Sequence, residues 1–498
     1  MAIFRRILFY LFVLIYIIGC PLTIMYILGR VINPETQKVV GKGLIYISNL
    51  PPSTTIYINN VIQTEQTPTI IRGLPEGNYT IKLFNEKYLP YEKTVHVEEK
   101  KAIALTRILP VPKEWKKDFL SKLPFDDLIP IEDTAFVLAR RGPLVKDLFI
   151  FKLSESFQQS LHADAIIPSK VSSFRPLLNN DSIYSKAKVL KIFTVKGSNI
   201  CILKISADKN TLFLWINPKN SDSIIADITA LFPDEPDQIL WDPDEDKIFF
   251  SLQDNHINRL NIQDKALYPK IINNVRSFKV KNKEIYTLLQ DSALRKWDYK
   301  GVEQDSHLNN ASIQPLTDSK EDITPSVKIK DTVLFLDHNG KLLINHSPFE
   351  IPVQNIKGFD FEEKDKKLLF WTKNKIGSLD IFSSKAVDAL ANKRAASINW
   401  LVNGKNNITQ AFWAYKGSHI LYADSDNIYL TEADIFDKPG EVEITSIKKN
   451  SHIYYSDITG KCYYLEPKTL KLVSLEIIPP HSIIPQSVSE DINKLEGK

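Results

Sequence analysis

The feature that most constrains the fold is a strand pattern that recurs from Ile131 to Leu475. Each unit has an apolar run, a turn rich in Asp, Asn or Lys, a second apolar run, a second turn and a third apolar run. Six clear copies span residues 237–262, 276–299, 326–345, 356–381, 408–433 and 441–466, and weaker copies span about 134–153 and 187–217. Long segments with the 3.6-residue period of an amphipathic helix do not occur here. The pattern therefore predicts an all-β body.

A period of roughly 40 residues with several short strands per unit is typical of a β-propeller. One such unit cannot bury both faces of its sheet alone, whereas packing in a ring covers them and leaves only short edges. We predict seven or eight blades over residues 131–475, with two stacked β-sandwiches as the structural alternative. Trp241-Asp242-Pro243-Asp244 resembles the turn between the first two strands of a blade in TolB-like and WD40-like propellers.

The N-terminal segment is uncharged from Ile7 to Leu28, long enough for a helix to cross the roughly 30 Å core of a bilayer. We therefore expect residues 1–33 to form a transmembrane anchor. Basic residues flank both ends of this segment, so the positive-inside rule hardly orients it. A short N-terminal arm before a single span favours a single-pass cell-membrane protein whose C-terminal body is extracytoplasmic.

Two other interpretations of this segment stay open. A cleaved secretory signal has a shorter apolar run and a small-residue cleavage site that is absent here. Ile17-Ile18-Gly19-Cys20 resembles a bacterial lipobox, which would put a lipid on Cys20.

Residues 41–108 alternate apolar and polar positions in short runs separated by turns, which predicts a small β-sandwich. Asn59-Asn60 is a candidate hairpin turn, because Asn tolerates positive φ. The stretches GLIYISNLPPSTTIYINN (43–60), TPTIIRGLPEGNYTIKL (67–83) and KYLPYEKTVHV (87–97) resemble a PEGA domain, a module of bacterial and archaeal surface proteins. The resemblance implies a spacer or adhesion role at the cell envelope and no enzymatic activity.

This resemblance has two departures. Pro51-Pro52-Ser53-Thr54 stands where the namesake tetrapeptide is expected, and Lys87 replaces the usual glycine before Tyr88. Both changes fall in turns, so they bear on turn geometry and leave the strand pattern intact.

Two segments lack this strand periodicity. Residues 109–130 contain several prolines and are predicted to be a linker, with a short amphipathic helix over 113–123. Residues 476–498 are mixed in charge and aperiodic, and are predicted to be a flexible tail.

Composition excludes several classes of function. The net charge is +4 with basic and acidic residues interleaved, so no nucleic-acid-binding footprint is present. The three cysteines, Cys20, Cys201 and Cys462, form no C-x-x-C pair, and a Cys201–Cys462 disulfide would require an extracytoplasmic body. Only 17 glycines occur, which argues against phosphate-binding glycine loops. The histidines form no H-E-x-x-H pair and no G-x-S-x-G elbow occurs, so we assign no catalytic, cofactor-binding or metal-binding residues and expect no cofactor.

Acidic and aromatic residues within the repeats have structural explanations. Asp424-Ser425-Asp426-Asn427 lacks the loop length and terminal Glu of an EF-hand and is predicted to be a hairpin turn. Asp242, Asp244, Glu245 and Asp246 are predicted to form a solvated turn rather than a metal site. The tryptophans near the strands are predicted to pack between blades rather than to stack on sugars; they are Trp215, Trp241, Trp297, Trp371 and Trp413.

These observations favour a membrane-anchored interaction or scaffold protein, not an enzyme, whose propeller binds an envelope protein or a cell-wall polymer outside the cytoplasm. The alternative is a propeller-based polysaccharide hydrolase or lyase, which requires two carboxyl groups about 5–10 Å apart near the ring axis. A scaffold that faces the cytoplasm is a third hypothesis, since fold alone does not decide function.

Overall fold

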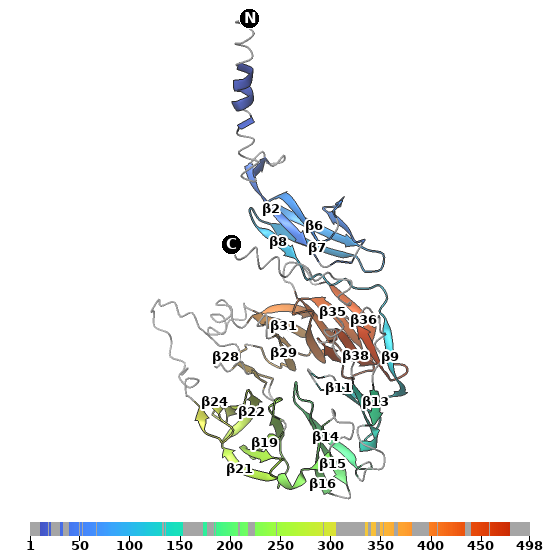
Figure 1. Ribbon diagram of the computed structural model, residues 1–498, viewed down its shortest axis with the longest axis vertical. Helices are drawn as coiled ribbons and strands as arrows, with labels where there is room; N and C mark the ends of the chain where they lie inside the picture. The colour runs from blue at the N-terminus through green and yellow to red at the C-terminus, as the bar shows by residue number, and fades with distance from the viewer. Residues whose placement is uncertain are drawn as a thin grey trace. The chain divides into compact units, whose positions relative to one another are not determined.

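The computed structural model describes most of the chain as two compact units (Figure 1). Apart from one or two positions inside some ranges, the described residues are 10–20, 30–32, 39–131, 134–152, 173–176, 184–217, 225–304, 334–336, 340–344, 349–362, 367–380, 398–433 and 440–478. The first unit spans the chain up to Trp115, and the second runs from Lys116 to Ile477 with an interruption at 434–439.

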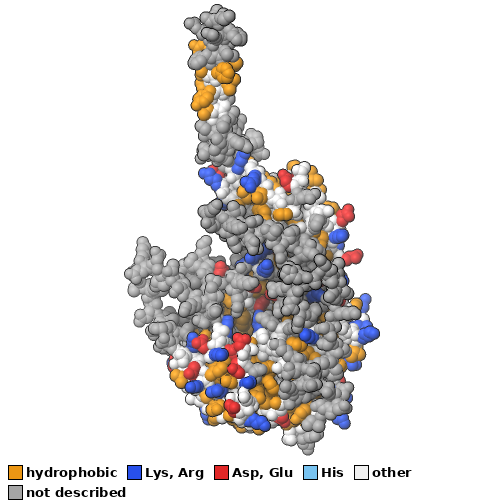
Figure 2. Space-filling view, viewed as in Figure 1, with side chains coloured by type: hydrophobic (Ala, Val, Ile, Leu, Met, Phe, Trp, Pro, Cys, Tyr) orange, Lys and Arg blue, Asp and Glu red, His pale blue; other side chains and the backbone are white. Residues whose placement is uncertain are grey.

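The predicted transmembrane helix is wrong. The longest helical run described near the N-terminus covers residues 10–17, which rise about 12 Å at 1.5 Å per residue. Within the described part of the chain, no helix combines the length and apolar character that a membrane crossing requires. The side chains of Tyr10–Ile17 are nevertheless exposed and hydrophobic (Figure 2).

The first unit contains two four-stranded sheets around one apolar core. Their strands are β1 (Arg30–Ile32), β2 (Val39–Ile47), β5 (Thr69–Pro75) and β8 (Ala102–Leu105) in one sheet, and β3 (Thr55–Ile58), β4 (Val61–Ile62), β6 (Gly77–Phe84) and β7 (Tyr91–Val97) in the other. Alternating side chains such as Ile45 and Ile81 are fully buried, which confirms the predicted sandwich. Asn59 and Asn60 have φ of 48° and 67° and form the predicted turn between β3 and β4.

The second unit contains eight small sheets among its described residues. In chain order their strands are β10 (Asp127–Pro130), β11 (Phe136–Arg140), β12 (Leu148–Lys152), β13 (Ser173–Pro176); β14 (Lys188–Thr194), β15 (Cys201–Ala207), β16 (Asn210–Ile216), β17 (Ile225–Asp227); β18 (Gln238–Trp241), β19 (Ile248–Gln253), β20 (His256–Asn261), β21 (Ala266–Ile272); β22 (Val275–Lys281), β23 (Glu284–Leu289), β24 (Leu294–Trp297), β25 (Glu303–Gln304); β26 (Leu334–Leu336), β27 (Leu342–Ile344), β28 (Phe349–Glu350); β29 (Gly358–Glu362), β30 (Lys367–Trp371), β31 (Lys375–Asp380), β32 (Asn399–Asn403); β33 (Gln410–Ala414), β34 (His419–Ala423), β35 (Asn427–Glu432), β36 (Glu441–Ser446); and β37 (Tyr454–Ser456), β38 (Lys461–Leu465), β39 (Lys471–Glu476) with β9 (Lys117–Pro124).

Neighbouring sheets share buried side chains around the ring. Phe136 of the first sheet packs in one cluster with Leu203 of the second, and Phe250 of the third with Phe278 of the fourth. Trp371 of the sixth sheet joins Trp413 of the seventh in the same way. First strands of adjacent sheets contact one another at β14 and β18, β18 and β22, and β29 and β33, so the first strands surround the axis. This arrangement is that of a β-propeller.

Strand β9 closes the ring, and it corrects the predicted linker. Residues 117–124 pair antiparallel with β39, so Lys117 lies opposite Leu475 and Phe119 opposite Val473. The helix expected over 113–123 is therefore wrong. Beside β9, Phe125 and Phe151 pack against Tyr454 and Leu472, which joins the last sheet to the first. The predicted tail lies largely outside the described residues.

Candidate functional site

Turns within the sheets and connections between the sheets meet at one face of the ring. Because strands alternate in direction within each antiparallel sheet, the turn between its second and third strands lies at the same end as the connection to the next sheet. We call this end of the second unit the loop face. Two pockets among the described residues open here, at equivalent places in the fourth and sixth sheets.

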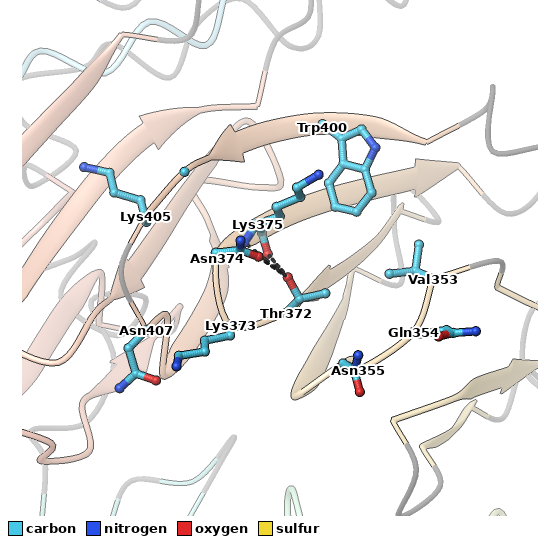
Figure 3. A pocket seen from close by; sticks show the side chains of 11 residues that line it. Val353, Gln354, Asn355, Thr372, Lys373, Asn374, Lys375, Trp400, Lys405 and Asn407 are labelled. Atoms are coloured by element: carbon cyan, nitrogen blue, oxygen red, sulfur yellow. Dashed lines mark hydrogen bonds between the residues drawn. The ribbon is translucent and has the colours of Figure 1, made fainter.

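The Lys373 pocket encloses about 890 Å³ at the sixth sheet. It is built from the connection that precedes β29, the β30–β31 turn, β32 and the connection that follows it. The residues that line it are Val353, Gln354, Asn355, Thr372, Lys373, Asn374, Lys375, Trp400, Gly404, Lys405 and Asn407 (Figure 3). They include three lysines and no carboxylate.

Hydrogen bonds hold the β30–β31 turn in shape. The buried Thr372 accepts a hydrogen bond at Oγ1 from the amide of Lys375 at 3.2 Å, and its own amide donates to the Lys375 carbonyl at 2.9 Å. The carbonyl of Lys373 accepts from the amide of Ile408 at 2.7 Å, which ties the turn to the connection after β32. These contacts leave the side chains of Lys373, Asn374 and Lys375 exposed.

Each cation of the pocket has a distinct environment. Lys375 Nζ lies 5.2 Å from the centre of the Trp400 ring, and Figure 3 shows the two side chains beside each other. Lys405 Nζ lies 2.5 Å from Glu441 Oε1 and 4.1 Å from the centre of the Tyr429 ring. Among the described residues, neither Lys373 nor Lys375 forms an ion pair. Two of the three positive charges are therefore available to a ligand.

Glu441 fixes the third cation. Burial lowers the pKa of Lys405, but the hydrogen bond and the negative charge of Glu441 outweigh it, and the net pKa is raised. The Tyr422 hydroxyl donates to the other oxygen of Glu441 at 2.5 Å, and burial and this carboxylate hold the pKa of Tyr422 above its usual value. Lys405 therefore stays positively charged and is held against one wall.

The Asn274 pocket encloses about 450 Å³ at the fourth sheet. Its lining residues are Ile271, Ile272, Asn273, Asn274, Leu289, Gln290, Asp291, Arg295 and Trp297. Arg295 Nη1 contacts both carboxylate oxygens of Glu303 at 2.9 Å, and Trp297 Nε1 donates to Thr287 at 2.8 Å. Glu303 therefore neutralises the positive charge of Arg295 in this pocket, whereas two lysines of the Lys373 pocket form no ion pair among the described residues.

The acidic turns divide into two cases. Asp424 Oδ1 accepts from the amides of Asp426 and Asn427 at 2.9 and 2.7 Å, which confirms the hairpin turn. Asp242 is only 2% exposed, so its prediction as part of a solvated turn is wrong. Its carboxylate accepts from the amides of Asp244 and Lys283, at 3.1 and 2.7 Å, and thereby joins the third sheet to the fourth. Asp246 lies outside the described residues.

Most of the tryptophan predictions are confirmed. Trp241, Trp371 and Trp413 are at least 91% buried between sheets, and Trp215 packs against the same cluster as Trp241. Trp297 packs against the core but also lines the Asn274 pocket. Trp400 was missed, because it lies in a fourth strand that the repeat pattern did not include.

Among the residues that the structure describes, the cysteines form no disulfide and potential metal ligands form no cluster. Cys201 and Cys462 are free and fully buried in different sheets, so the candidate disulfide is absent. Groups of three or more potential metal ligands do not occur among described residues. On the innermost strand β29, Asp360 accepts from the Trp413 amide at 2.9 Å and lies 3.7 Å from Lys196 Nζ of the second sheet.

Comparison with known proteins matches a family model to part of the first unit. Residues 42–110 match the PEGA domain. The β-propeller domain of Cps50 (Swd1) from Myceliophteria thermophila is a structural neighbour at 8% identity and a TM-score of 0.37, over 73% of this chain and 99% of that one. Curated protein sequences give no match. Residues 42–110 thus carry the PEGA match, while the propeller-like arrangement of the second unit rests on its own sheets and their contacts.

Proposed function

We propose that this protein is an interaction or scaffold protein of the cell envelope, and that its propeller-like unit binds a wall polymer outside the cytoplasm. The PEGA domain is the spacer in this proposal, and the loop face is the binding surface. Binding, not bond cleavage, is the activity that we assign.

The observation that carries the proposal is the placement of two pockets at equivalent positions of one face. Each lies between a sheet-to-sheet connection and the turn between the second and third strands of a sheet. A polymer can extend across one face of the ring, so one chain can contact both pockets although their charges differ. Charges over the rest of the visible surface are interleaved (Figure 2), so broad electrostatic attraction is not the basis of the proposal.

Location is tested with a protease-cleavable tag placed after Lys498 of the full chain. Intact spheroplasts that express the tagged protein are treated with protease, and the tag is followed by immunoblotting. Cleavage in intact spheroplasts is expected. A tag that survives until lysis would place the C-terminal end in the cytoplasm and refute the extracytoplasmic location.

Binding is tested by sedimenting the purified full chain with isolated cell walls that have been stripped of protein. Co-sedimentation is expected, with no release of soluble wall fragments. Release of fragments would support the hydrolase or lyase alternative instead. If the chain remains in the supernatant and binds only walls that keep their proteins, the partner is an envelope protein.

A further inference from the structure

The Lys373 pocket has the chemistry of a site for an anionic saccharide. We propose that it binds one acidic sugar unit of a polysaccharide, with Lys373 and Lys375 on the anionic group and Trp400 against the sugar ring. This inference rests on the proposed function and adds to it the chemical class of the polymer.

The charge of the pocket selects an anion. Lys373 and Lys375 are exposed on one short turn, and neither forms an ion pair among the described residues, whereas Lys405 is matched by Glu441. The lining includes no carboxylate, and the carboxylate that contacts it, Glu441, is paired with Lys405. A carboxylate or phosphate placed between these two ammonium groups would form charge-assisted hydrogen bonds.

The remaining lining residues select a sugar over a simple anion. Gln354, Asn355, Asn374 and Asn407 carry amides that both donate and accept hydrogen bonds, which suits the hydroxyl groups of a sugar. Trp400 is half-buried and presents an amphipathic ring beside Lys375. A volume of about 890 Å³ is also far larger than a phosphate or acetate ion needs.

The fixed backbone of the β30–β31 turn also supports the assignment of this pocket as a saccharide site. The turn that carries both lysines is fixed by Thr372 and by the contact of the Lys373 carbonyl with Ile408, so only the two side chains need to be ordered on binding. A site on a fixed backbone loses less entropy when it binds than a mobile loop does.

The test measures binding of polygalacturonic acid and hyaluronan to the purified full chain by calorimetry. The comparators are dextran, a neutral polysaccharide, and poly-glutamate, an acidic polymer without sugar rings. We expect at least one acidic polysaccharide to bind, dextran not to bind, and poly-glutamate to bind at least tenfold more weakly. Failure of both acidic polysaccharides, or equal binding of poly-glutamate, would overturn the proposal.

Variants locate the site. K373A/K375A is expected to weaken binding at least tenfold, and Trp400→Ala about fivefold, while Trp400→Phe retains most of the affinity. The matched control K247A/K300A removes two exposed lysines from turns at the opposite end of the sheets and is expected to change affinity less than twofold. Unchanged thermal unfolding shows that each variant is folded. Equal losses in K373A/K375A and the control would refute the site.

The two proposals fail in different ways. If the full chain sediments with stripped walls but K373A/K375A sediments equally well, the assignment of this pocket is wrong and wall binding stands. If the full chain does not sediment with stripped walls, the proposed function fails whatever the defined polymers show.

Discussion

Asp242 shows how a single residue joins two sheets of the ring. Its carboxylate is almost fully buried and accepts hydrogen bonds from backbone amides of two neighbouring turns, while Tyr299 Oη lies 3.3 Å from it. The tetrapeptide that contains it was recognised from the sequence, but its burial was not. The fourth sheet covers this carboxylate. Because the residues of that sheet are distant from Asp242 in the sequence, the tetrapeptide alone does not reveal the burial.

Removal of this carboxylate should therefore be costly. Asp242→Ala leaves buried donors without an acceptor, and we expect the free energy of unfolding to fall by about 2–4 kcal/mol. The measurement is urea unfolding followed by tryptophan fluorescence, which reports mainly the second unit. Asp244→Asn, at an exposed neighbour, is the control and should change stability by less than about 0.5 kcal/mol. Equal effects of the two substitutions would contradict this role.

Buried thiols give a second prediction at this scale. Burial raises the pKa of Cys201 to about 12, and it raises that of Cys462 as well. Since the thiolate is the reactive form, neither should react with a disulfide reagent near pH 8 while the chain is folded. When modified thiols are counted, Cys201 and Cys462 should be modified only after urea has unfolded the chain. Rapid modification of either in the native chain would show that its sheet opens readily.

Strands at the outer edge of each sheet mark the limit of prediction from this sequence. Three apolar runs per unit were recognisable, because inner strands such as β19 and β34 are almost continuously buried. Fourth strands such as β21 and β36 are mostly exposed or half-buried, so they lack the continuous buried run of the inner strands. The copy assigned to 441–466 consequently starts in β36 of the seventh sheet. The Lys373 pocket was missed for a related reason, since Trp400 belongs to such a strand.

Strand β9 should contribute strongly to the stability of the second unit. Replacement of residues 117–124 in the full chain by a Gly-Ser segment of equal length removes its ladder with β39 and exposes a sheet edge. We expect a loss of about 3 kcal/mol or more, because each ladder hydrogen bond contributes roughly 0.5–1.5 kcal/mol. The control replaces residues 479–486 in the same way. Similar urea midpoints for the two variants would show that ring closure does not depend on β9.

The junction between the last and first sheets should respond to pH. His452 Nδ1 lies 3.2 Å from Asp127 Oδ1, and this hydrogen bond raises the pKa of His452 although partial burial opposes it. Arg140 also faces Asp127, and Lys448 faces Asp126. A raised folded-state pKa stabilises the fold below the unfolded-state pKa of about 6.5, and this contribution is lost as pH rises through the folded-state value.

The expected change is small, because His452 is 56% exposed and such pairs contribute under about 1 kcal/mol. His452→Gln should therefore lower the urea midpoint, relative to the parent chain, slightly more at about pH 5.5 than at about pH 8.5. An equal loss at both pH values, or a larger loss at pH 8.5, would contradict the sign of this effect.

At the scale of the whole molecule, the repeat pattern predicted the ring but not the partner that closes it. Periodicity reports which strands are alike, whereas closure depends on the pairing of segments at opposite ends of the unit.

Two pockets on one face predict a dependence on polymer length. A polygalacturonate chain long enough to reach both pockets should bind at least tenfold more tightly than a trimer, because its second contact is intramolecular. Calorimetry with size-fractionated polymers tests this, and Gln290→Ala in the Asn274 pocket should reduce the gain. Equal affinity per chain for trimer and polymer would mean that a single pocket is engaged.

The pairing of Lys117 with Leu475 also has a consequence for biosynthesis. β9 leaves the ribosome before the eight sheets have been made, and its partner β39 is almost the last strand to follow. For most of translation β9 therefore has no partner strand. An unpaired strand of this kind can pair with a wrong strand or with another chain. A nascent chain that is truncated just before β39 contains the seven preceding sheets and still lacks the strand with which β9 pairs.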